Sequence, residues 1–332
     1  MITISDIAKL ANVSTSTVSN AFNKPDALSV KTRQHIFDIC QQYGYRLEYF
    51  KKEHNDSPST LIEFNILTAG YITYFTQEII AGLLEEAAQQ NTQILITLRD
   101  KHMTHITSPQ RPVDGRILIH TLVNDQLDEN VPTVLIGKTQ QASLVSQINN
   151  HNIDIIYEAT KLLIDMGHQH ILFFNTDSKL TVAHERLNGF KRCLSQHGLV
   201  YSPANHHMCD VQQEPNKYIY QLLRQKPYLL DNMSAIICDS THMAEGIYQA
   251  LNDLGITVPD QISILSICRN SSIHQFTPTI SYFDLRPKLL GRTALRQTLA
   301  MIQGDPARKI FIDHQFVSGG SIGYPSKIAL VF

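Results

Sequence analysis

The sequence predicts an all-α head followed by an α/β core of two doubly wound lobes. Two observations indicate this fold class. Residues 2–45 hold three short amphipathic segments, each preceded by a residue whose side chain can cap a helix. From Leu61 onward, segments rich in β-branched residues alternate with longer amphipathic segments, a pattern typical of parallel strands joined by helices.

The first helix of the head is expected to begin at Ser5, whose hydroxyl can accept a backbone N–H of the first turn. Asp6 favours the positive end of the helix dipole. The apolar face consists of Ile7, Ala8, Leu10 and Ala11. Asn12 occupies the following turn, because asparagine tolerates a left-handed conformation better than other non-glycine residues.

The second helix is predicted from Thr15 to about Phe22, with Ser14 as its N-cap. Val18 and Phe22 lie four residues apart and face inward. The outward positions are polar, namely Thr15, Ser16, Ser19 and Asn20. A recognition helix enters the major groove with such residues first, and an asparagine such as Asn20 can form two hydrogen bonds with adenine.

A third helix is predicted after Ser29 and ends near Gly44. One side of this helix is apolar and consists of Ile36, Ile39, Cys40 and Tyr43. Its first turn carries Lys31, Thr32 and Arg33, which suit a DNA phosphate. Any small helical bundle has capped amphipathic helices, so these features indicate DNA binding only together with a longer motif.

That longer motif resembles the N-terminus of the LacI family of bacterial transcriptional regulators. The matching residues are Thr3, Ile4, Asp6, Ile7, Ala8, Ala11, Val13, Ser14, Thr17, Val18, Ser19, Asn23, Leu28, Ser29, Thr32, Arg33, Gly44 and Tyr45. The resemblance implies a helix-turn-helix domain over residues 1–46 whose DNA contacts come from Thr3, Ser14, Thr15, Ser16, Thr17, Asn20, Asn23, Ser29, Thr32, Arg33 and Tyr45. Asn12 replaces the usual turn glycine, and Asn20 replaces an arginine, so we expect a changed base preference.

Composition limits the class of protein. The chain has 332 residues, is 43% apolar and carries a net charge of −2, so no overall basic field drives DNA binding. Residues 1–54 hold only two more basic than acidic residues, so one head should bind weakly and a homodimer should bind better. Five unpaired cysteines, no leader sequence and no membrane-length apolar run predict a cytoplasmic protein.

Residues 47–60 are predicted to be a linker, because polarity rises there. In the LacI family a hinge helix lies in this place and inserts a leucine into the minor groove. This chain has His54 at the leucine position, Lys51 at the small-residue position and Leu47 at the proline position. The resemblance is weakest here, and it does not predict hinge-driven kinking of DNA.

Residues 61–332 are predicted to be the effector-binding and dimerisation core. Strands are expected at Ile62–Thr68, Gln93–Leu98, Arg116–His120, Thr133–Ile136, His170–Phe174, Ala235–Cys238 and Ile262–Ile267. Helices are expected at Gln77–Gln90, Ile153–Met166, His184–Gln196, Asn216–Gln225 and Met243–Leu254. There are too many strands for one small sheet, so we predict two lobes with a ligand cleft between them at the carboxyl ends of the strands.

Landmarks of the core also resemble the LacI family, whose core is similar to periplasmic sugar-binding proteins. They include Val113-Asp114-Gly115, Gly167-His168, Glu185-Arg186-Leu187, Val258-Pro259, Thr277-Pro278 and Val317–Gly323. A third lobe crossing is expected after Thr277-Pro278, near Ser281–Leu285. The resemblance implies an N-lobe of about 61–147 and 278–314 and a C-lobe of about 148–277 and 315–332. Residues 99–112 are too few for the usual helix and contain two prolines, so a loop and a smaller N-lobe surface are expected.

The resemblance places effector-binding residues in both lobes. Arg186 matches an arginine that holds effector hydroxyl or acidic groups, although an ion pair with Glu185 or Asp177 is the alternative. Phe75 and Thr76 align with residues that stack on or bond the effector, and packing within a loop is the alternative for Phe75.

The carboxylates that the family carries at two places in the core are lost. Thr241 replaces the effector-binding aspartate, and Ser266–Arg269 replaces the companion Gly-Phe-Asp-Asp motif. With Arg186, Arg269 and the polar Ser240 and Thr241 in place, we expect an acidic or phosphorylated ligand. A core that binds no ligand is the competing hypothesis.

No cofactor, metal or catalytic residue is predicted. Fifteen histidines are present, but the close pairs His168/His170 and His206/His207 lack metal-site spacing with a carboxylate. Gly319, Gly320 and Gly323 resemble a phosphate loop only loosely, because no helix-forming segment follows them. No nucleophile motif is found, so we expect a protein that is not an enzyme.

The sequence therefore predicts a sequence-specific DNA-binding transcriptional regulator, expected to be a repressor. Its predicted partners are double-stranded operator DNA, a second copy of itself and a small effector, either a sugar, a sugar phosphate or a related metabolite. The alternatives are a DNA-binding dimer without a ligand and a sugar-binding module or enzyme with a vestigial head. A vestigial head should lose its capping serines and inward apolar residues, and both survive here.

Overall fold

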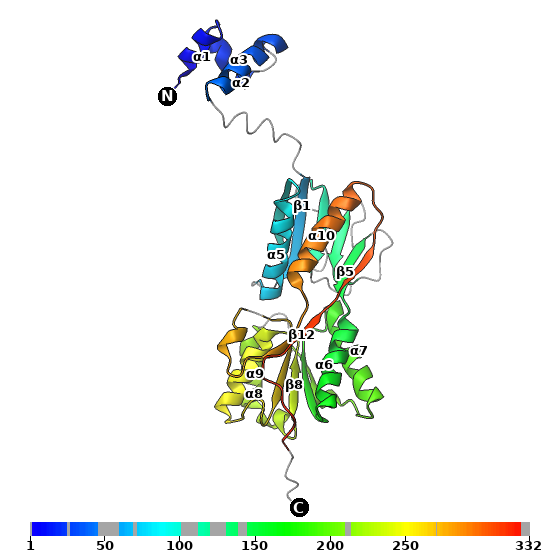
Figure 1. The fold of residues 1–332 in the computed structure, drawn as a ribbon. Coiled ribbons are helices and arrows are strands. Elements are labelled where there is room, and N and C mark those ends of the chain that lie inside the picture. The colour runs from blue at the N-terminus through cyan, green and yellow to red at the C-terminus, as the bar shows by residue number, and fades with distance from the viewer. Residues whose placement is uncertain are drawn as a thin grey trace, which may run out of the picture. The chain divides into compact units, whose positions relative to one another are not determined.

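The computed structural model describes residues 2–24, 27–45, 60–68, 72–100, 112–119, 131–138, 145–209, 214–269 and 271–326. The chain divides into two compact units, Met1–Ser59 and Thr60–Phe332 (Figure 1). The predicted linker at 47–60 lies outside the described residues except for Thr60, which begins the first strand. Among the described residues, no helix has both the length and the apolar character needed to span a bilayer.

The described residues of the first unit, 2–24 and 27–45, form a head of three helices. It consists of α1 (Ile4–Leu10), α2 (Thr15–Asn23) and α3 (Val30–Gln42). Its core is formed by residues with little or no exposed surface, namely Ile7, Ala8, Ala11, Val18, Ala21, Phe22, Ile36, Phe37 and Cys40. The inward positions predicted for α2 are therefore confirmed, whereas Leu10 and Tyr43 are 45% and 46% exposed.

The helix ends of the head differ from the prediction at one point. α1 begins one residue before Ser5, and its N-cap is Thr3, which forms a reciprocal capping box with Asp6. Asn12 has the expected positive φ of 53°, and its turn lets the Val13 amide donate to the Ala8 carbonyl over 2.9 Å. Gly44 also has a positive φ, of 67°, just after α3.

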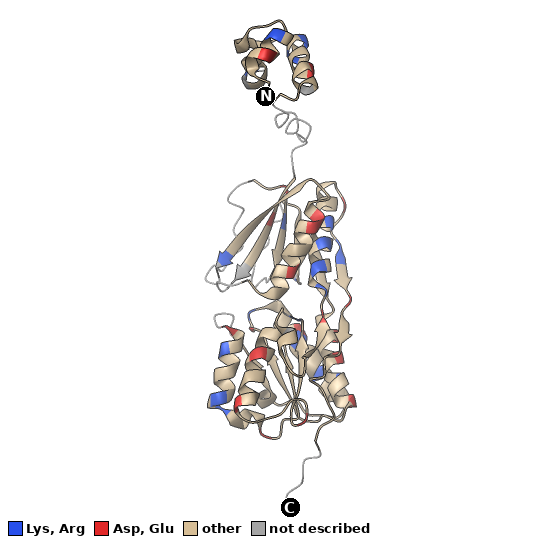
Figure 2. Cartoon of the chain, turned by 60° about the vertical axis from the view of Figure 1, so that its left-hand side comes forward, with Lys and Arg blue, Asp and Glu red and all other residues tan. Residues whose placement is uncertain are grey.

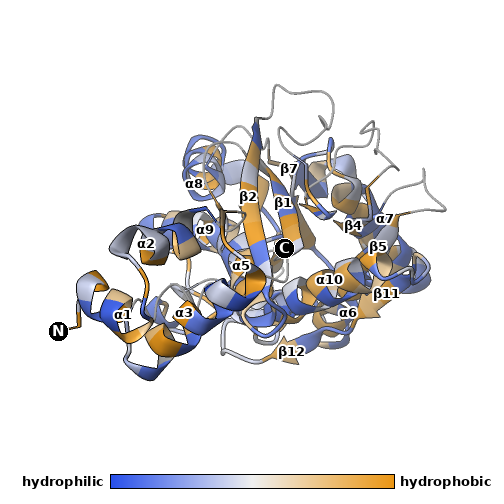
Figure 3. Cartoon of the chain, turned by 90° about the horizontal axis from the view of Figure 1, so that it is seen from above, coloured by the Kyte–Doolittle hydropathy of each residue, from blue (hydrophilic) through white to orange (hydrophobic). Residues whose placement is uncertain are grey.

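The described strands of the first lobe form a six-stranded parallel sheet in the order β11-β5-β4-β3-β1-β2. The strands are β1 (Thr60–Thr68), β2 (Thr92–Asp100), β3 (Gly115–Ile119), β4 (Thr133–Ile136), β5 (Ser146–Asn150) and β11 (Lys309–Ile312). Helices α5 (Tyr74–Ala87) and α10 (Pro287–Ile302) pack against each other and bury one apolar cluster with the sheet (Figure 3).

Charges on these two helices are matched. Glu85 pairs with Lys288 and Arg292, and Glu86 pairs with Arg296 over 2.7 Å. Figure 2 shows basic and acidic residues in blue and red on the helices of the core. On the other face of the sheet, the buried Arg116 donates to Glu63 over 2.7 Å, and Thr97 donates to the other oxygen of Glu63 over 2.7 Å. The predicted loop begins in β2 with Arg99 and Asp100, and residues 101–111 lie outside the described residues.

The second lobe contains six described strands in the order β12-β10-β9-β8-β6-β7, with only β12 antiparallel to its neighbour. The strands are β6 (Ile171–Asn175), β7 (His206–Met208), β8 (Ala235–Cys238), β9 (Ser263–Ile267), β10 (Ser281–Asp284) and β12 (Gln315–Val317). The helices are α6 (Asn152–Asp165), α7 (Thr181–Gln196), α8 (Pro215–Gln225) and α9 (Thr241–Asp253).

Helices cover both faces of this second sheet. Leu172 and Phe174 of β6 join a cluster with α8 and α9, while Ile171 and Phe173 join another with α6 and α7. Alternate residues of one strand are therefore buried on opposite faces, as expected of a parallel sheet covered on both sides. All five cysteines of the chain are free and buried, as predicted.

Several elements of the core are not predicted from the sequence. Strands β5, β7, β10, β11 and β12 are three to five residues long and lack a strong apolar pattern, and α10 was also missed. The crossing expected near Ser281–Leu285 lies after Asp284, because β10 pairs with β9 in the second sheet, so the approximate lobe boundary of 278 falls before β10. The other boundary, predicted after residue 147, lies after Asn150, where β5 ends.

One side chain connects the three crossings between the lobes. The Asn150 amide donates to the Leu285 carbonyl over 3.1 Å and to the Ile312 carbonyl over 2.9 Å. Asn150 ends β5, Leu285 follows β10, and Ile312 ends β11, so a buried amide joins all three segments where the chain changes lobes.

Candidate nucleic-acid interface and ligand site

The first turn of α2 presents a group of hydroxyls. The Ser14 Oγ accepts the Thr17 amide over 3.0 Å, which confirms its role as N-cap. The same oxygen lies 2.7 Å from the Ser16 Oγ and 2.8 Å from the Thr17 Oγ1. Thr15 and Ser16 are exposed and Asn20 is half-buried, so the polar face predicted for base contacts is available at the start of α2.

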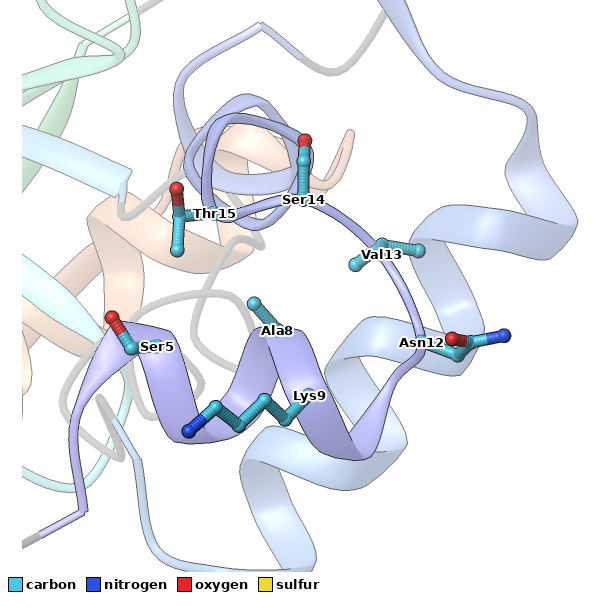
Figure 4. A pocket seen from close by; sticks show the side chains of 7 residues that line it. All are labelled: Ser5, Ala8, Lys9, Asn12, Val13, Ser14 and Thr15. Carbon is cyan, nitrogen blue, oxygen red and sulfur yellow. The ribbon is translucent and has the colours of Figure 1, made fainter.

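A shallow groove of about 570 Å³ separates α1 from the start of α2 (Figure 4). Ser5 and Lys9 border it from α1, and Ser14 and Thr15 border it from α2. Asn12 and Val13 line the connecting turn. Lys9 therefore places a positive charge beside the polar end of α2, where a DNA phosphate can be attracted.

The residues at the start of α3 that are predicted to bind DNA have two different roles. Ser29 accepts the Thr32 amide over 3.1 Å and lies 2.7 Å from the Thr32 hydroxyl, so both act at the helix start. Arg33 instead donates from Nε to the Ala21 carbonyl over 3.1 Å, and its guanidinium lies 4.8 Å from the Phe37 ring centre. Arg33 thus fastens α3 to α2, which orients the recognition helix.

The remaining predicted head residues have structural positions. Thr3 caps α1, and its hydroxyl donates to the Asp6 carboxylate over 2.6 Å. This bond and the Thr3 amide hold the pKa of Asp6 below its usual range. The half-buried Tyr45 packs against the head core. The side chain of Asn23 lies outside the described residues.

The predicted ligand residues of the second lobe meet at the carboxyl ends of its strands. Arg186, on α7, forms a buried ion pair with Asp239, which directly follows β8. The alternative partners expected for Arg186, Glu185 and Asp177, do not hold it. Glu185 lies 3.0 Å from Lys138 of the first lobe and accepts the Asn152 amide over 2.9 Å.

The hydroxyl residues at the start of α9 serve the backbone. Ser240 is the N-cap and accepts the Met243 amide over 3.4 Å. Thr241 is 1% exposed, and its hydroxyl donates to the Cys268 carbonyl over 2.6 Å. Neither side chain is therefore positioned primarily for a ligand.

The first-lobe residues lie at the start of α5. Thr76 is 1% exposed, and its amide donates to the Thr73 hydroxyl over 3.2 Å. Phe75 packs against apolar clusters of both lobes, so it lies where the lobes meet. Arg269 of the second lobe approaches the Glu78 carboxylate to 4.0 Å and the Tyr74 ring centre to 5.9 Å.

These contacts bear on the charge of the predicted ligand site. Arg186 and Arg269, which were expected to create a positive site, each have a carboxylate partner, Asp239 and Glu78 respectively. Sequence spacing missed Asp239 because it lies 53 residues from Arg186, and only the order of strands in the sheet joins them.

The close histidine pairs have other partners. His168 Nδ1 lies 2.9 Å from the Ser234 hydroxyl and Nε2 lies 2.8 Å from the Gly323 carbonyl, and burial lowers the pKa of His168. Burial also lowers the pKa of His206 from 6.5 to about 4. Among the residues that the structure describes, no three His, Cys, Asp or Glu side chains form a group able to hold a metal.

Comparison with known proteins covers both units. Residues 3–47 match the profile of "Bacterial regulatory proteins, lacI family", and residues 160–322 match that of "Periplasmic binding protein-like domain". The chain belongs to the LacI family. It is 24% identical to a probable HTH-type transcriptional repressor ExuR of Bacillus subtilis strain 168, with 97% of this chain and 98% of the relative covered. It is 27% identical to an HTH-type transcriptional repressor PurR of Glaesserella parasuis, with 91% of each covered.

Solved structures of LacI-family regulators share the fold. The transcriptional regulator CelR–cellobiose complex is 20% identical, with a TM-score of 0.69 and coverage of 97% of this chain and 100% of that chain. The lac repressor dimer bound to operator and the anti-inducer ONPF is 19% identical, with a TM-score of 0.68 and coverage of 96% and 98%. As a LacI-family member, the chain is a DNA-binding transcriptional regulator and not an enzyme.

Within the LacI-family core, this chain redistributes charge. The positions at which the resemblance places family carboxylates hold Thr241, Cys268 and Arg269, and the hydroxyl of Thr241 bonds to the backbone. Asp239, two residues before Thr241, supplies a carboxylate to Arg186 instead. Cys268 is 6% exposed and adopts a positive φ of 68° directly after β9.

Proposed function

We propose that this LacI-family protein is a repressor that binds operator DNA as a homodimer and responds to a small effector held between the lobes. The exposed polar turn at the start of α2 carries the proposal. Thr15 and Ser16 are exposed there, and Ser14 caps the helix so that its N-terminal end is well defined. Asn20 lies on the same helix with a side chain able to bond adenine.

The scaffold behind α2 supports this function. Val18 and Phe22 fill the head core, and Arg33 anchors the α2 backbone through Ala21. A recognition helix must be held rigidly, because each specific base contact depends on placement within a fraction of an ångström. The relatives ExuR and PurR are described as repressors, which favours repression over activation.

The low positive charge available for binding DNA supports dimerisation. The whole chain carries a net charge of −2, so a single head has little electrostatic attraction to DNA. Two linked heads convert the second binding event into an intramolecular one and raise affinity without new contacts. The solved lac repressor is a dimer on its operator, and this chain has the same fold.

An effector site between the lobes is supported by the polar groups at the carboxyl ends of the second sheet. Arg186, Asp239 and Arg269 gather there, and Phe75 and Glu78 of the first lobe meet them. A solved relative of the same fold is described with cellobiose and another with ribose. A ligand that contacts both lobes can shift their arrangement if it binds the arrangements unequally.

The test is genome-wide mapping of bound sites, followed by gel-shift assays on the strongest site. We expect the Ser16→Ala/Asn20→Ala double variant to lose base discrimination, by about tenfold or more, because each good base contact contributes about 1–3 kcal/mol. Gln42→Ala, at the exposed end of α3, is the control and should bind like the wild type. Unchanged sequence preference in the double variant would refute the role of these two residues.

A further inference from the structure

The Arg186–Asp239 pair is the most deeply buried charge pair at the carboxyl end of the second sheet. Each residue is 7% exposed. Asp239 is fixed by its place directly after β8, where its amide donates to the Phe174 carbonyl over 2.9 Å. Arg186 reaches it from the second turn of α7. Buried charges need such pairing, because an unpaired one would be strongly disfavoured.

The pair holds the guanidinium without satisfying it. The Nη1 atom of Arg186 donates a hydrogen bond to Oδ1 of Asp239. Arg186 Nε is buried and has no acceptor in the part of the chain that the structure describes. A buried donor without a partner is costly, and native sites with such donors often complete them with a ligand or water. The site therefore contains a buried N–H donor, Arg186 Nε, that a ligand or water oxygen could accept from.

The described side chains around the pair carry no net positive charge. The Cys268 thiol beside it stays protonated, because burial raises its pKa to about 12. Arg269 is paired with Glu78, and Lys138 is paired with Glu185 across the lobes. Asp284 is the last residue of β10, and its negative charge also raises the pKa of the Cys268 thiol. No uncompensated cation is thus left among these described side chains to hold an anion.

We propose that Asp239 determines the charge selectivity of the effector site, so that this regulator binds a neutral polyhydroxylated ligand and rejects its anionic counterparts. The inference rests on the proposed effector site. One ligand hydroxyl would accept from Arg186 Nε, and a neighbouring hydroxyl would donate to the Asp239 carboxylate. An anion at the same place would also meet the Asp239 charge in a buried, weakly screened site.

The experiment is a thermal-shift and calorimetry series on the full-length protein. The ligands are neutral hexoses, pentoses and polyols, each beside its uronate or phosphate ester. We expect a neutral compound to stabilise the wild type and its anionic counterpart to bind at least tenfold more weakly. Asp239→Asn should lose at least tenfold in neutral-ligand affinity and reverse the preference, because Arg186 is then uncompensated.

Asp165→Asn is the matched control, since it removes one exposed carboxylate from the end of α6 in the same lobe. It should retain the wild-type preference. If Asp239→Asn does not fold, the neutral pair Arg186→Gln/Asp239→Asn replaces it and should lose the response to both ligand classes. Preference of the wild type for an anion, or an unchanged preference in Asp239→Asn, would overturn the proposal.

Gel-shift assays on the same preparations separate this inference from the proposed function. Specific DNA binding with a preference for anionic ligands contradicts the role of Asp239 alone. A wild-type protein that neither class stabilises contradicts the effector site and this inference with it. Loss of DNA binding by the wild type contradicts the repressor function, whatever the ligand preference.

Discussion

Thr3 and Asp6 fix the start of the head by bonding to each other in both directions. The Thr3 amide donates to the Asp6 carboxylate over 2.9 Å, and the Asp6 amide donates to the Thr3 hydroxyl over 3.4 Å. Ser5 is equally plausible from its type alone, because any serine before an apolar face can cap a helix. Thr3 is the cap because only it has an acidic residue three positions later.

We expect Thr3→Ala to destabilise the head by about 1 kcal/mol, since the substitution removes the N-cap side chain. The measurement is chemical unfolding of the isolated first unit, residues 1–59, followed by circular dichroism. Ser5→Ala is the control and should change the unfolding free energy by a few tenths of a kcal/mol at most. Equal losses in the two variants would contradict the assigned cap.

At the scale of elements, glycines set how closely helix pairs approach. Gly189 of α7 lies so near α6 that an added Cβ would be 2.2 Å from the Ile153 carbonyl oxygen. Gly291 of α10 is in the same position against α5, where the Ile79 carbonyl oxygen would also be 2.2 Å away. Which helix each of these glycines faces depends on the packed structure.

Gly189→Ala should destabilise the second lobe by about 1–3 kcal/mol, because α6 and α7 must separate to admit a methyl group. Gly189 is helical, so the better helix propensity of alanine offsets up to about 1 kcal/mol of this loss. The measurement is the thermal unfolding midpoint of the full chain. Ala183→Gly on the same helix controls for propensity, and a Gly189→Ala midpoint at or above that of the wild type would contradict the close contact.

At the scale of the whole molecule, buried histidines make the stability of the second lobe depend on pH. Burial lowers the pKa values of His168, His206 and His207. Below about pH 6.5 these histidines bind protons in the unfolded chain but stay neutral in the folded chain. Proton binding therefore stabilises the unfolded state and lowers the free energy of unfolding. Stability should therefore be complete above the ordinary histidine pKa and fall progressively toward pH 4, where folded His206 begins to titrate.

We expect the thermal midpoint of the core to be lower at pH 5 than at pH 7.5 and this difference to shrink in His206→Gln. Differential scanning calorimetry at both pH values measures the effect. His170→Gln removes an exposed histidine from the same lobe and should leave the pH difference unchanged. A pH difference that is identical in wild type and His206→Gln would contradict the buried, neutral state of His206.

The sequence by itself determined the three-helix head, its Ser14 and Ser29 caps, the strand–helix alternation and the LacI-family class. These follow from local signals, since a helix period, a cap or a β-branched segment is contained within a few neighbouring residues. The tertiary structure alone decided that Arg33 supports α2, that Asn150 joins three crossings and that Arg186 faces Asp239. Those contacts join residues 12 to 162 positions apart, and only the order of strands and the packing of helices bring them together.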